Sequence, residues 1–362
     1  MSGASSIEMP LSKLLHIQFL RGLAALSVAC LHAQHDAVSL AARTGQAFEP
    51  FTRLPFTAGV DVFFVISGFI MVYASRPLFG KPEARGVFLA RRLARIAPLY
   101  WAVTTLYLAI GLVAPAVLNQ PQPSAGMVIA SYLFVPVARG DGLVQPVYSL
   151  GWTLNYEMFF YVLFALVIVL PMRSALARLM AILAGLAVLG AFVRLPATLA
   201  FWTDPIILEF ALGVGLGWLQ NRGFSLSRPV RWGLAVAAFG ILLAAGPNPG
   251  AGPFIRPLVW GIPAAMLVAA AALREDRAMA VSPFTRFCAF LGDISYAIYL
   301  IHPFVIRGIG EVIVRTGVAT HLGPIGFVIV ALAGTVIAAV IVHRAFERPA
   351  TASMRRRLER PA

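Results

Sequence analysis

The first long apolar segment of the chain carries an arginine and a histidine. Its sequence, HIQFLRGLAALSVACLHAQHD, places Arg21 and His32 close to three helical turns apart. On a helix they would face the same side, about 16 Å apart along the axis. An imidazole can take a proton from a hydroxyl group near neutral pH, so His32 is a candidate general base. Alternatively, Arg21 extends its side chain to the lipid headgroups, and His32 is a structural histidine packed between helices.

Two later apolar segments each contain a carboxylate. GVDVFFVISGFIM contains Asp61, and SLGWTLNYEMFFYV contains Glu157. An ionised residue at the centre of a membrane-spanning helix costs about 2.5–3.5 kcal/mol, so such residues require a reason. If both segments start at the outer surface, both acids lie level with His32. Either one could then orient the imidazole, as the acid does in hydrolase triads. Asp61 could instead cap its helix at the interface.

A second histidine and two aromatic residues are further candidates for lining a site. His302, in LGDISYAIYLIHPFVI, is expected near the outer end of its helix and at the depth of His32. It could line the same site or, with the proline that follows it, end the helix. Trp152 and Tyr156 could contact substrate or belong to an ordinary interfacial aromatic belt. We expect His35 and Asp36 to be loop residues.

An arginine pair begins the third apolar segment, in ARRLARIAPLYW. Arg92 and Arg95 are three positions apart and share one face of a helix. Guanidinium groups bind phosphates in a bidentate manner, so the pair is a candidate phosphate site. Positive charge that only sets the membrane orientation is the alternative. Asp204 and Glu209, in a later apolar segment, are weaker candidates for a functional site.

Composition defines the environment in which these residues act. The chain has 362 residues, of which 59% are hydrophobic and only 12% are charged, about half the charged fraction of a soluble domain. Lipid must therefore cover most of its surface. The formal net charge is +14, and the arginines that cause it lie in short loops between apolar segments. This distribution is typical of positive charge that sets the orientation of a membrane protein, and not of a nucleic-acid-binding surface. No zinc-type spacing of cysteine and histidine predicts a metal site.

We predict an all-α, polytopic membrane helix bundle with about ten transmembrane helices. A further segment at 125–137 is too short to cross a bilayer of about 30 Å, and we expect it to be re-entrant or interfacial. The expected spans are 17–35, 57–75, 97–118, 152–170, 175–194, 204–220, 231–246, 257–273, 287–306 and 324–345.

The arginines decide the orientation. If the N-terminus is cytoplasmic and segment 125–137 does not cross, every large group of arginines lies on the cytoplasmic side of the membrane. If segment 125–137 crosses, the groups that follow it lie on the outer side instead. We therefore expect a cytoplasmic N-terminal tail over 1–16, a transmembrane domain over 17–346 and a basic cytoplasmic tail over 347–362. Both termini are then cytoplasmic.

Several motifs, taken in order, resemble the acyltransferase 3 family of integral membrane O-acyltransferases. Family members carry a basic residue and a histidine separated by ten residues on the first helix, matched by Arg21 and His32. They also carry an R-x-x-R motif after the second helix, matched by Arg92 and Arg95. Further segments that look like family signatures are GVDVFFVISGF (59–69), SLGWTLNYEMFFY (149–161), SYAIYLIHPF (295–304) and FERP (346–349).

The resemblance implies an acyl-CoA co-substrate, with acetyl as the default acyl group, and no tightly bound cofactor. It also implies a carbohydrate acceptor, such as exopolysaccharide or O-antigen, and the inner membrane of a bacterium. Many relatives carry a second acid after the middle glutamate, where this chain has Met158. Glu157 is therefore the only carboxylate at that point, and a paired role for it is in doubt.

Acyl transfer could then run across the membrane. Arg92 and Arg95 would hold the CoA phosphates at the cytoplasmic mouth, and the pantetheine arm would pass Arg21 towards His32. A proton-coupled transporter or glycan flippase is the main alternative, because buried acids and histidines also relay protons. Such a protein is expected to show inverted repeats, and none is evident in the sequence. A non-catalytic membrane scaffold is the third possibility.

Overall fold

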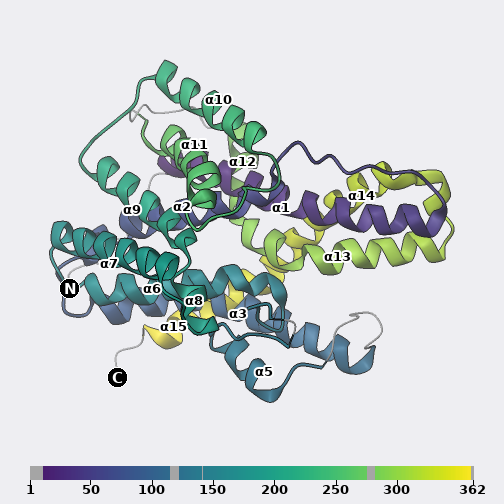
Figure 1. Ribbon diagram of the computed structural model, residues 1–362, viewed down its shortest axis with the longest axis horizontal. Coiled ribbons are helices and arrows are strands. Elements are labelled where there is room, and N and C mark those ends of the chain that lie inside the picture. Colours follow the sequence, from purple (N-terminus) through teal and green to yellow (C-terminus); the bar gives the residue numbers. More distant parts are fainter. Residues whose placement is uncertain (1–10, 115–121, 141, 275–281, 360–362) are drawn as a thin grey trace.

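The computed structural model describes residues 11–114, 122–140, 142–274 and 282–359, and these form an all-helical protein (Figure 1). No β-strand occurs in this part of the chain. The α-helices are α1 (Leu11–Thr44), α2 (Gly59–Ala74), α3 (Ala84–Val113), α5 (Ala125–Tyr132), α6 (Trp152–Val167), α7 (Met172–Phe192), α8 (Ala197–Trp202), α9 (Leu208–Asn221), α10 (Arg228–Ala245), α11 (Ile262–Ala272), α12 (Pro283–Asp293), α13 (Ser295–Arg315), α14 (Ala319–Val342) and α15 (Arg348–Leu358).

The predicted membrane bundle is confirmed. Within the described residues, nine helices are long and apolar enough to span a membrane. The tenth expected span corresponds to the shorter apolar helix Pro257–Ala272, which starts with a π-helical turn and continues as α11. The expected short segment contains only α5, whose eight residues measure about 12 Å and cannot cross a bilayer.

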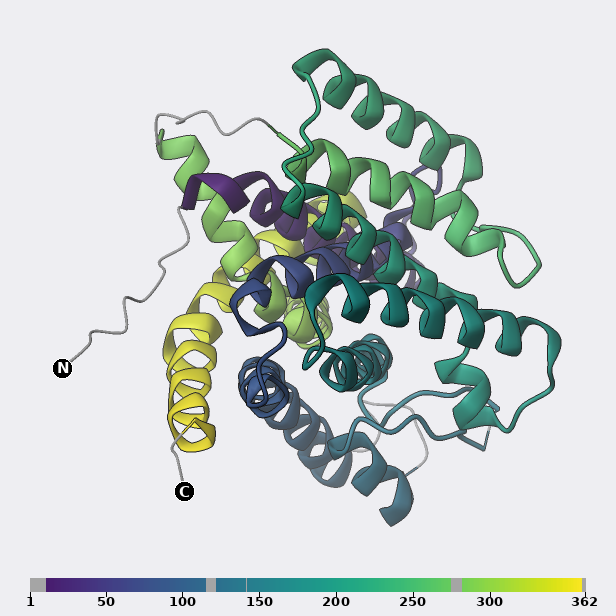
Figure 2. The same ribbon diagram turned by 90° about the vertical axis from the view of Figure 1, so that its left-hand side faces the viewer.

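Several helix boundaries differ from the sequence prediction, and three of these differences affect the arrangement of the site and the tail. First, α1 continues to Thr44, so His35 and Asp36 lie on a helix and not in a loop. Second, the expected span 287–306 is two helices. The chain turns at Ile294, where the Ser295 hydroxyl donates to the Gly292 carbonyl oxygen at 2.7 Å. Third, the basic C-terminal segment forms α15, which lies beside α3 (Figure 2).

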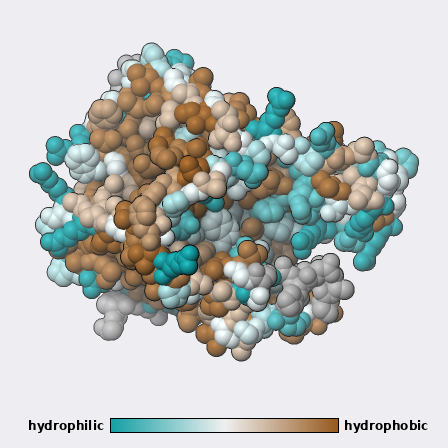
Figure 3. Space-filling model, viewed as in Figure 1, coloured by the Kyte–Doolittle hydropathy of each residue, from teal (hydrophilic) through white to brown (hydrophobic). Residues whose placement is uncertain are grey.

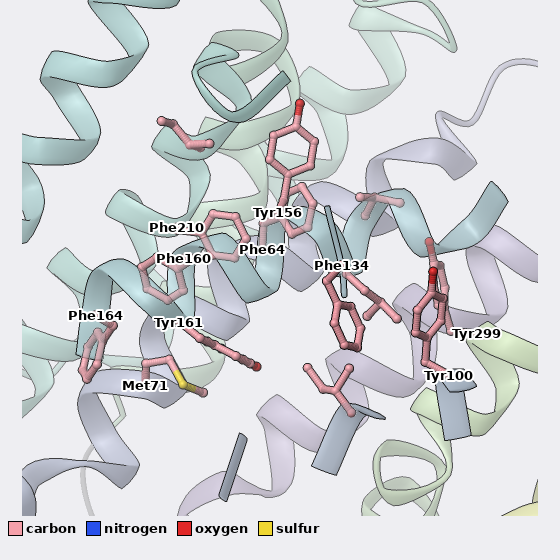
Figure 4. Close-up of a cluster of buried hydrophobic side chains, with 14 of the residues drawn as sticks. Phe64, Met71, Tyr100, Phe134, Tyr156, Phe160, Tyr161, Phe164, Phe210 and Tyr299 are labelled. Atoms are coloured by element: carbon pink, nitrogen blue, oxygen red, sulfur yellow. The ribbon is translucent and has the colours of Figure 1, made fainter. Parts of the chain in front are cut away.

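The centre of the bundle is built from aromatic side chains and close helix contacts. Phe210 stacks on Phe64 and on Phe160, with ring centroids 4.6 and 4.5 Å apart (Figure 4). Glycine allows α2 and α9 to approach each other. A Cβ atom at Gly68 would lie 2.1 Å from the Phe210 carbonyl oxygen, and one at Gly213 would lie 2.0 Å from a carbonyl oxygen of α2. Small residues of this kind are typical of close helix packing in membranes.

Three helices extend beyond the rest of the bundle. The 34 residues of α1 measure about 51 Å, well over the thickness of the hydrocarbon core. Its last turns pack against the end of α13 and the start of α14, and Arg43 pairs with Glu311 at 2.8 Å. We call this extension the arm: residues 33–44, 306–315 and 319–331. It projects to the right in Figure 1 and carries hydrophilic side chains in Figure 3, whereas hydrophobic residues gather over the body.

Candidate active site

A narrow cavity of about 100 Å³ lies between α1, α2, α3, α6 and α13. Four of the residues singled out in the sequence line it: Arg21, Arg92, Arg95 and Glu157. Sites for whole drug-sized ligands are typically ~300–1,000 Å³, so this cavity fits only a thin chain. Its other polar lining residues are Ser67, Thr153, Tyr161, Ser295, Tyr296 and Tyr299.

The arginines of the cavity keep donors available. Arg95 is exposed, whereas the Arg92 Nε atom is buried and has no hydrogen-bond partner among the described residues. The guanidinium carbon of Arg92 lies 5.7 Å from the centre of the Phe88 ring, which supports the side chain through a cation–π contact. A buried donor without a partner is costly, so this group is suited to an incoming acceptor such as a phosphate.

Arg21 is held by a hydrogen-bonded chain that reaches α12. It donates to the Gln18 side-chain oxygen at 3.2 Å, and the Gln18 amide donates to the Asp293 carboxylate at 2.8 Å. Burial raises the pKa of the Asp293 carboxyl group, and the charge of Arg21 opposes that rise. The turn between α12 and α13 therefore places a carboxylate where it fixes the position of Arg21.

Glu157 lies with the arginines and not beside His32 as the sequence predicted. It accepts hydrogen bonds from Ser67, at 3.0 Å, and from Tyr161. The reason is the start of α6, which lies inside the bundle and not at its outer end. The Thr153 hydroxyl, at the first turn of α6, donates to the Tyr299 hydroxyl at 3.0 Å. Glu157, one turn further along α6, therefore lies near the start of α13.

The two histidines form a direct contact. Nε2 of His302 lies 3.1 Å from Nδ1 of His32, and their ring centroids are 4.9 Å apart. His302 is fully buried, whereas His32 is half-buried. Pro303 does not end the helix as the sequence allowed, because α13 continues to Arg315.

The partners of the two rings define their tautomers. Nδ1 of His302 lies 3.1 Å from the Ile298 carbonyl oxygen, which only accepts, so in the neutral ring Nδ1 carries the proton. Nδ1 of His32 lies 3.0 Å from the Val28 carbonyl oxygen and faces the unprotonated Nε2 of His302. It is therefore the protonated nitrogen of His32. Nε2 of His32 is left with a lone pair and can act as a base.

Tyr299 joins the cavity to the histidine pair. Its side chain lines the cavity, and its ring centroid lies 6.3 Å from that of His302 and 6.0 Å from that of Phe63. Neither His32 nor His302 is among the described residues that line the cavity. Arg21, Arg92 and Arg95 line it, and the histidine pair lies next to it, against Tyr299.

Asp61 is not beside His32 either. It is fully buried and forms a bidentate ion pair with Arg256, at 3.0 and 3.1 Å. Residues 60, 63, 64 and 67 of α2 line the cavity, whereas Asp61 faces α9 and α11. Glu209, also fully buried, interacts electrostatically with both partners. We therefore assign Asp61 a structural role, because its charge is satisfied by Arg256.

The remaining candidates also lie away from the cavity. Trp152 packs under the Arg256 guanidinium, 5.7 Å from ring centre to Cζ, and Tyr156 stacks on Phe201 at 4.0 Å. Neither is among the described residues of the cavity wall. Asp204 caps a short helix by accepting from the backbone N–H of Ile206 at 2.8 Å.

Replacing Asp61 by alanine is expected to lower the free energy of unfolding by ~3 kcal/mol, because the half-buried Arg256 would lose its bidentate partner. Thermal unfolding of the purified protein in detergent measures this. The double variant Asp61→Leu, Arg256→Met is expected to recover most of the loss, since well-packed apolar residues often replace a buried ion pair without cost. A double variant that stays folded but loses all activity would show a chemical role for Asp61.

Some residues of the site could not be recognised in the sequence. Ser67 and Tyr161 bind Glu157, Gln18 holds Arg21, and Tyr299 connects the two ends of the site. Each is a common polar residue in an apolar segment. The only available signal was helical spacing, since Tyr161 is one turn from Glu157.

A family model described as an acyltransferase domain, Acyl_transf_3, matches residues 14–344. The chain belongs to the acyltransferase 3 family. This favours an O-acyltransferase over the transporter and scaffold alternatives. No solved structure matches the chain.

Two relatives support the assignment. The chain is 34% identical to the exopolysaccharide production protein ExoZ of Rhizobium meliloti (strain 1021) over 304 residues, which is 81% of this chain and 88% of the relative. It is 28% identical to the acyltransferase MdmB of Streptomyces mycarofaciens over 312 residues, which is 80% of this chain and 78% of the relative. The protein is thus a multi-pass membrane O-acyltransferase.

Proposed function

We propose that this acyltransferase moves an acetyl group from acetyl-CoA to a hydroxyl group of a carbohydrate. The observation that carries the proposal is the arrangement of the groups: arginines and Tyr299 line one narrow cavity, and a histidine pair lies against Tyr299. The cavity is too small for a nucleotide, so only part of the narrow pantetheine chain would enter it. The CoA phosphates would stay with Arg92 and Arg95, and the thioester would pass Arg21 on its way to His32.

The reaction uses the lone pair on Nε2 of His32. The acceptor hydroxyl oxygen attacks the thioester carbonyl carbon, and its proton passes to Nε2. The C–S bond then breaks, the ester remains on the acceptor, and the CoA sulfur takes the proton from the imidazolium. His302 acts on His32 as a positioning residue, because its Nε2 accepts a hydrogen bond from Nδ1–H of His32 and so keeps the lone pair on Nε2 of His32.

The carbohydrate acceptor is supported by one relative, whose name describes exopolysaccharide production. Both relatives come from bacteria, which supports placing the protein in a bacterial inner membrane. In the proposed orientation both termini and the arginine end of the cavity face the cytoplasm, where acetyl-CoA is made. The histidine end then faces the outer side, where exported glycans are found.

Replacing His302 by alanine is expected to lower kcat about tenfold, the effect of losing one net hydrogen bond. KM for both substrates should stay unchanged, because the histidine contacts neither. The His302→Gln variant should restore part of the rate, because the side-chain oxygen of glutamine can accept a hydrogen bond from Nδ1–H of His32. Steady-state kinetics of both variants measure this. Equal losses in alanine and glutamine variants that fold normally would argue against a positioning role.

The proposed function is tested by measuring CoA release. Purified protein is mixed with acetyl-CoA and with glycans extracted from the cell envelope. Release that requires a glycan, together with a gain of acetyl mass on that glycan, supports the proposal. Folded protein that releases no CoA with any glycan offered, but accepts another acyl donor, would overturn the choice of donor.

A further inference from the structure

The exposed side of the histidine pair is enclosed by residues from three helices and one loop. Phe304 and Arg307 follow His302 on α13, by two and five residues, and Asp36 follows His32 by one turn on α1. Figure 3 shows the surface hollowed between the arm and the lobe that holds α3 and α5. Asp36, Phe304 and Arg307 do not line the cavity that contains the arginines, so this surface is separate from it.

Three aromatic rings form one wall of this surface. Tyr148 stacks on Phe304 with centroids 5.4 Å apart, and Tyr107 of α3 lies 5.6 Å from Tyr148 and 6.5 Å from Phe304. The Tyr148 hydroxyl donates to the Leu300 carbonyl oxygen at 2.6 Å, which fixes the wall to α13. Tyr148 is buried, but Tyr107 and Phe304 are only half-buried and present apolar ring surface.

Opposite charges lie next to the aromatic wall. Asp36 and Arg307 are both close enough to His32 for electrostatic interaction, and Arg307 also interacts with Tyr107 and Tyr148. Arg307 is exposed and Asp36 is half-buried. A carboxylate accepts hydrogen bonds from hydroxyl groups, and a guanidinium donates to them in a fixed geometry.

We propose that Asp36, Tyr107, Phe304 and Arg307 form the acceptor-binding site and take one sugar ring of a carbohydrate. The C–H face of the ring lies on Tyr107 and Phe304, where it buries apolar surface. Its hydroxyl groups bond to Asp36 and Arg307, and the accepting hydroxyl points to Nε2 of His32. An apolar lipid chain would leave both charged groups without partners, so the mixed surface favours a sugar. This inference rests on the proposed function.

The test separates binding of the acceptor from binding of the donor. Arg307→Ala and Tyr107→Ala are each expected to raise the KM for a soluble glycan acceptor about tenfold, the effect of one lost contact group of ~1.4 kcal/mol. KM for acetyl-CoA should not change. Tyr107→Phe, which keeps the ring, should behave like the wild type.

Arg315 provides the matched control. It lies on the same helix as Arg307, its side chain is 81% exposed, and its ion partner is Glu311 on the arm. Arg315→Ala should leave both KM values unchanged. Folding of each variant is checked by thermal unfolding, and restoration of the rate at high acceptor concentration identifies a binding defect.

The outcomes distinguish this inference from the proposed function. If wild-type protein shows no acetyl-CoA-dependent transfer, the proposed function fails. If the wild type transfers acetyl groups but the Arg307 and Tyr107 variants keep the wild-type acceptor KM, the acceptor site lies elsewhere and the inference is overturned. Equal effects of Arg307→Ala and Arg315→Ala would also overturn it, because they would indicate a general charge effect.

Discussion

Replacing His32 by alanine is expected to lower kcat by about 10²–10⁴-fold, the usual contribution of general-base catalysis. The half-buried ring presents Nε2, which the contacts to Val28 and His302 leave unprotonated. Without it, the acceptor hydroxyl must lose its proton to water. Donor KM should change little, because the arginines lie at the far end of the cavity. Initial rates of CoA release at saturating acetyl-CoA and glycan measure the effect.

His321 provides the control for this variant. It is an exposed histidine at the start of α14, with its Nδ1 atom 3.1 Å from the hydroxyl of Thr320. His321→Ala is expected to keep the wild-type rate, and the unfolding temperature of both variants should match that of the wild type. Full activity of folded His32→Ala protein would refute the assignment of His32 as the base.

Replacing Arg92 and Arg95 together by alanine is expected to raise the KM for acetyl-CoA by about 10²–10⁴-fold. Each hydrogen bond to a charged group contributes ~1.5–3 kcal/mol, which corresponds to roughly 10–100-fold for each arginine. Acetyl-pantetheine lacks the nucleotide, so its KM should be the same for the variant and the wild type. Steady-state kinetics with the two donors measure the difference.

Arg91 gives a neighbouring control on α3. Its Nε atom pairs with the Glu359 carboxylate at 2.8 Å, and it does not line the cavity. Arg91→Ala should therefore keep the wild-type KM for acetyl-CoA. Equal losses with acetyl-CoA and acetyl-pantetheine in the double variant would contradict phosphate binding and indicate a disturbed cavity.

Hydropathy and helical spacing were sufficient to predict the bundle and one side of the site. Apolar length and the distribution of the arginines together separated the spans from the short segment that became α5. The separation of Arg21 and His32 predicted that they share one face of α1, and that face meets α13. The spacing of Arg92 and Arg95 predicted that they share one face of α3, and both line the cavity. These are local properties of one helix, so the sequence carries them directly.

Depth could not be predicted in the same way. The sequence argument assumed that each helix begins at the membrane surface, but the chain before α6 is buried at Val147 and Tyr148. Glu157 therefore lies further inward than its position in its segment suggests. The surroundings of Asp61 could not be predicted for another reason. Its partner Arg256 is 195 residues away, at the start of the helix that continues as α11, and long-range pairing leaves no periodic signal in one sequence.

The central claim is that donor and acceptor reach one active site from opposite sides of the membrane. The most direct test reconstitutes the protein in sealed vesicles, with acetyl-CoA enclosed and a membrane-impermeant oligosaccharide outside, and measures acetyl mass on the oligosaccharide. We expect product in this arrangement and none when both substrates are outside. Product only when both substrates are on the same side would contradict the account.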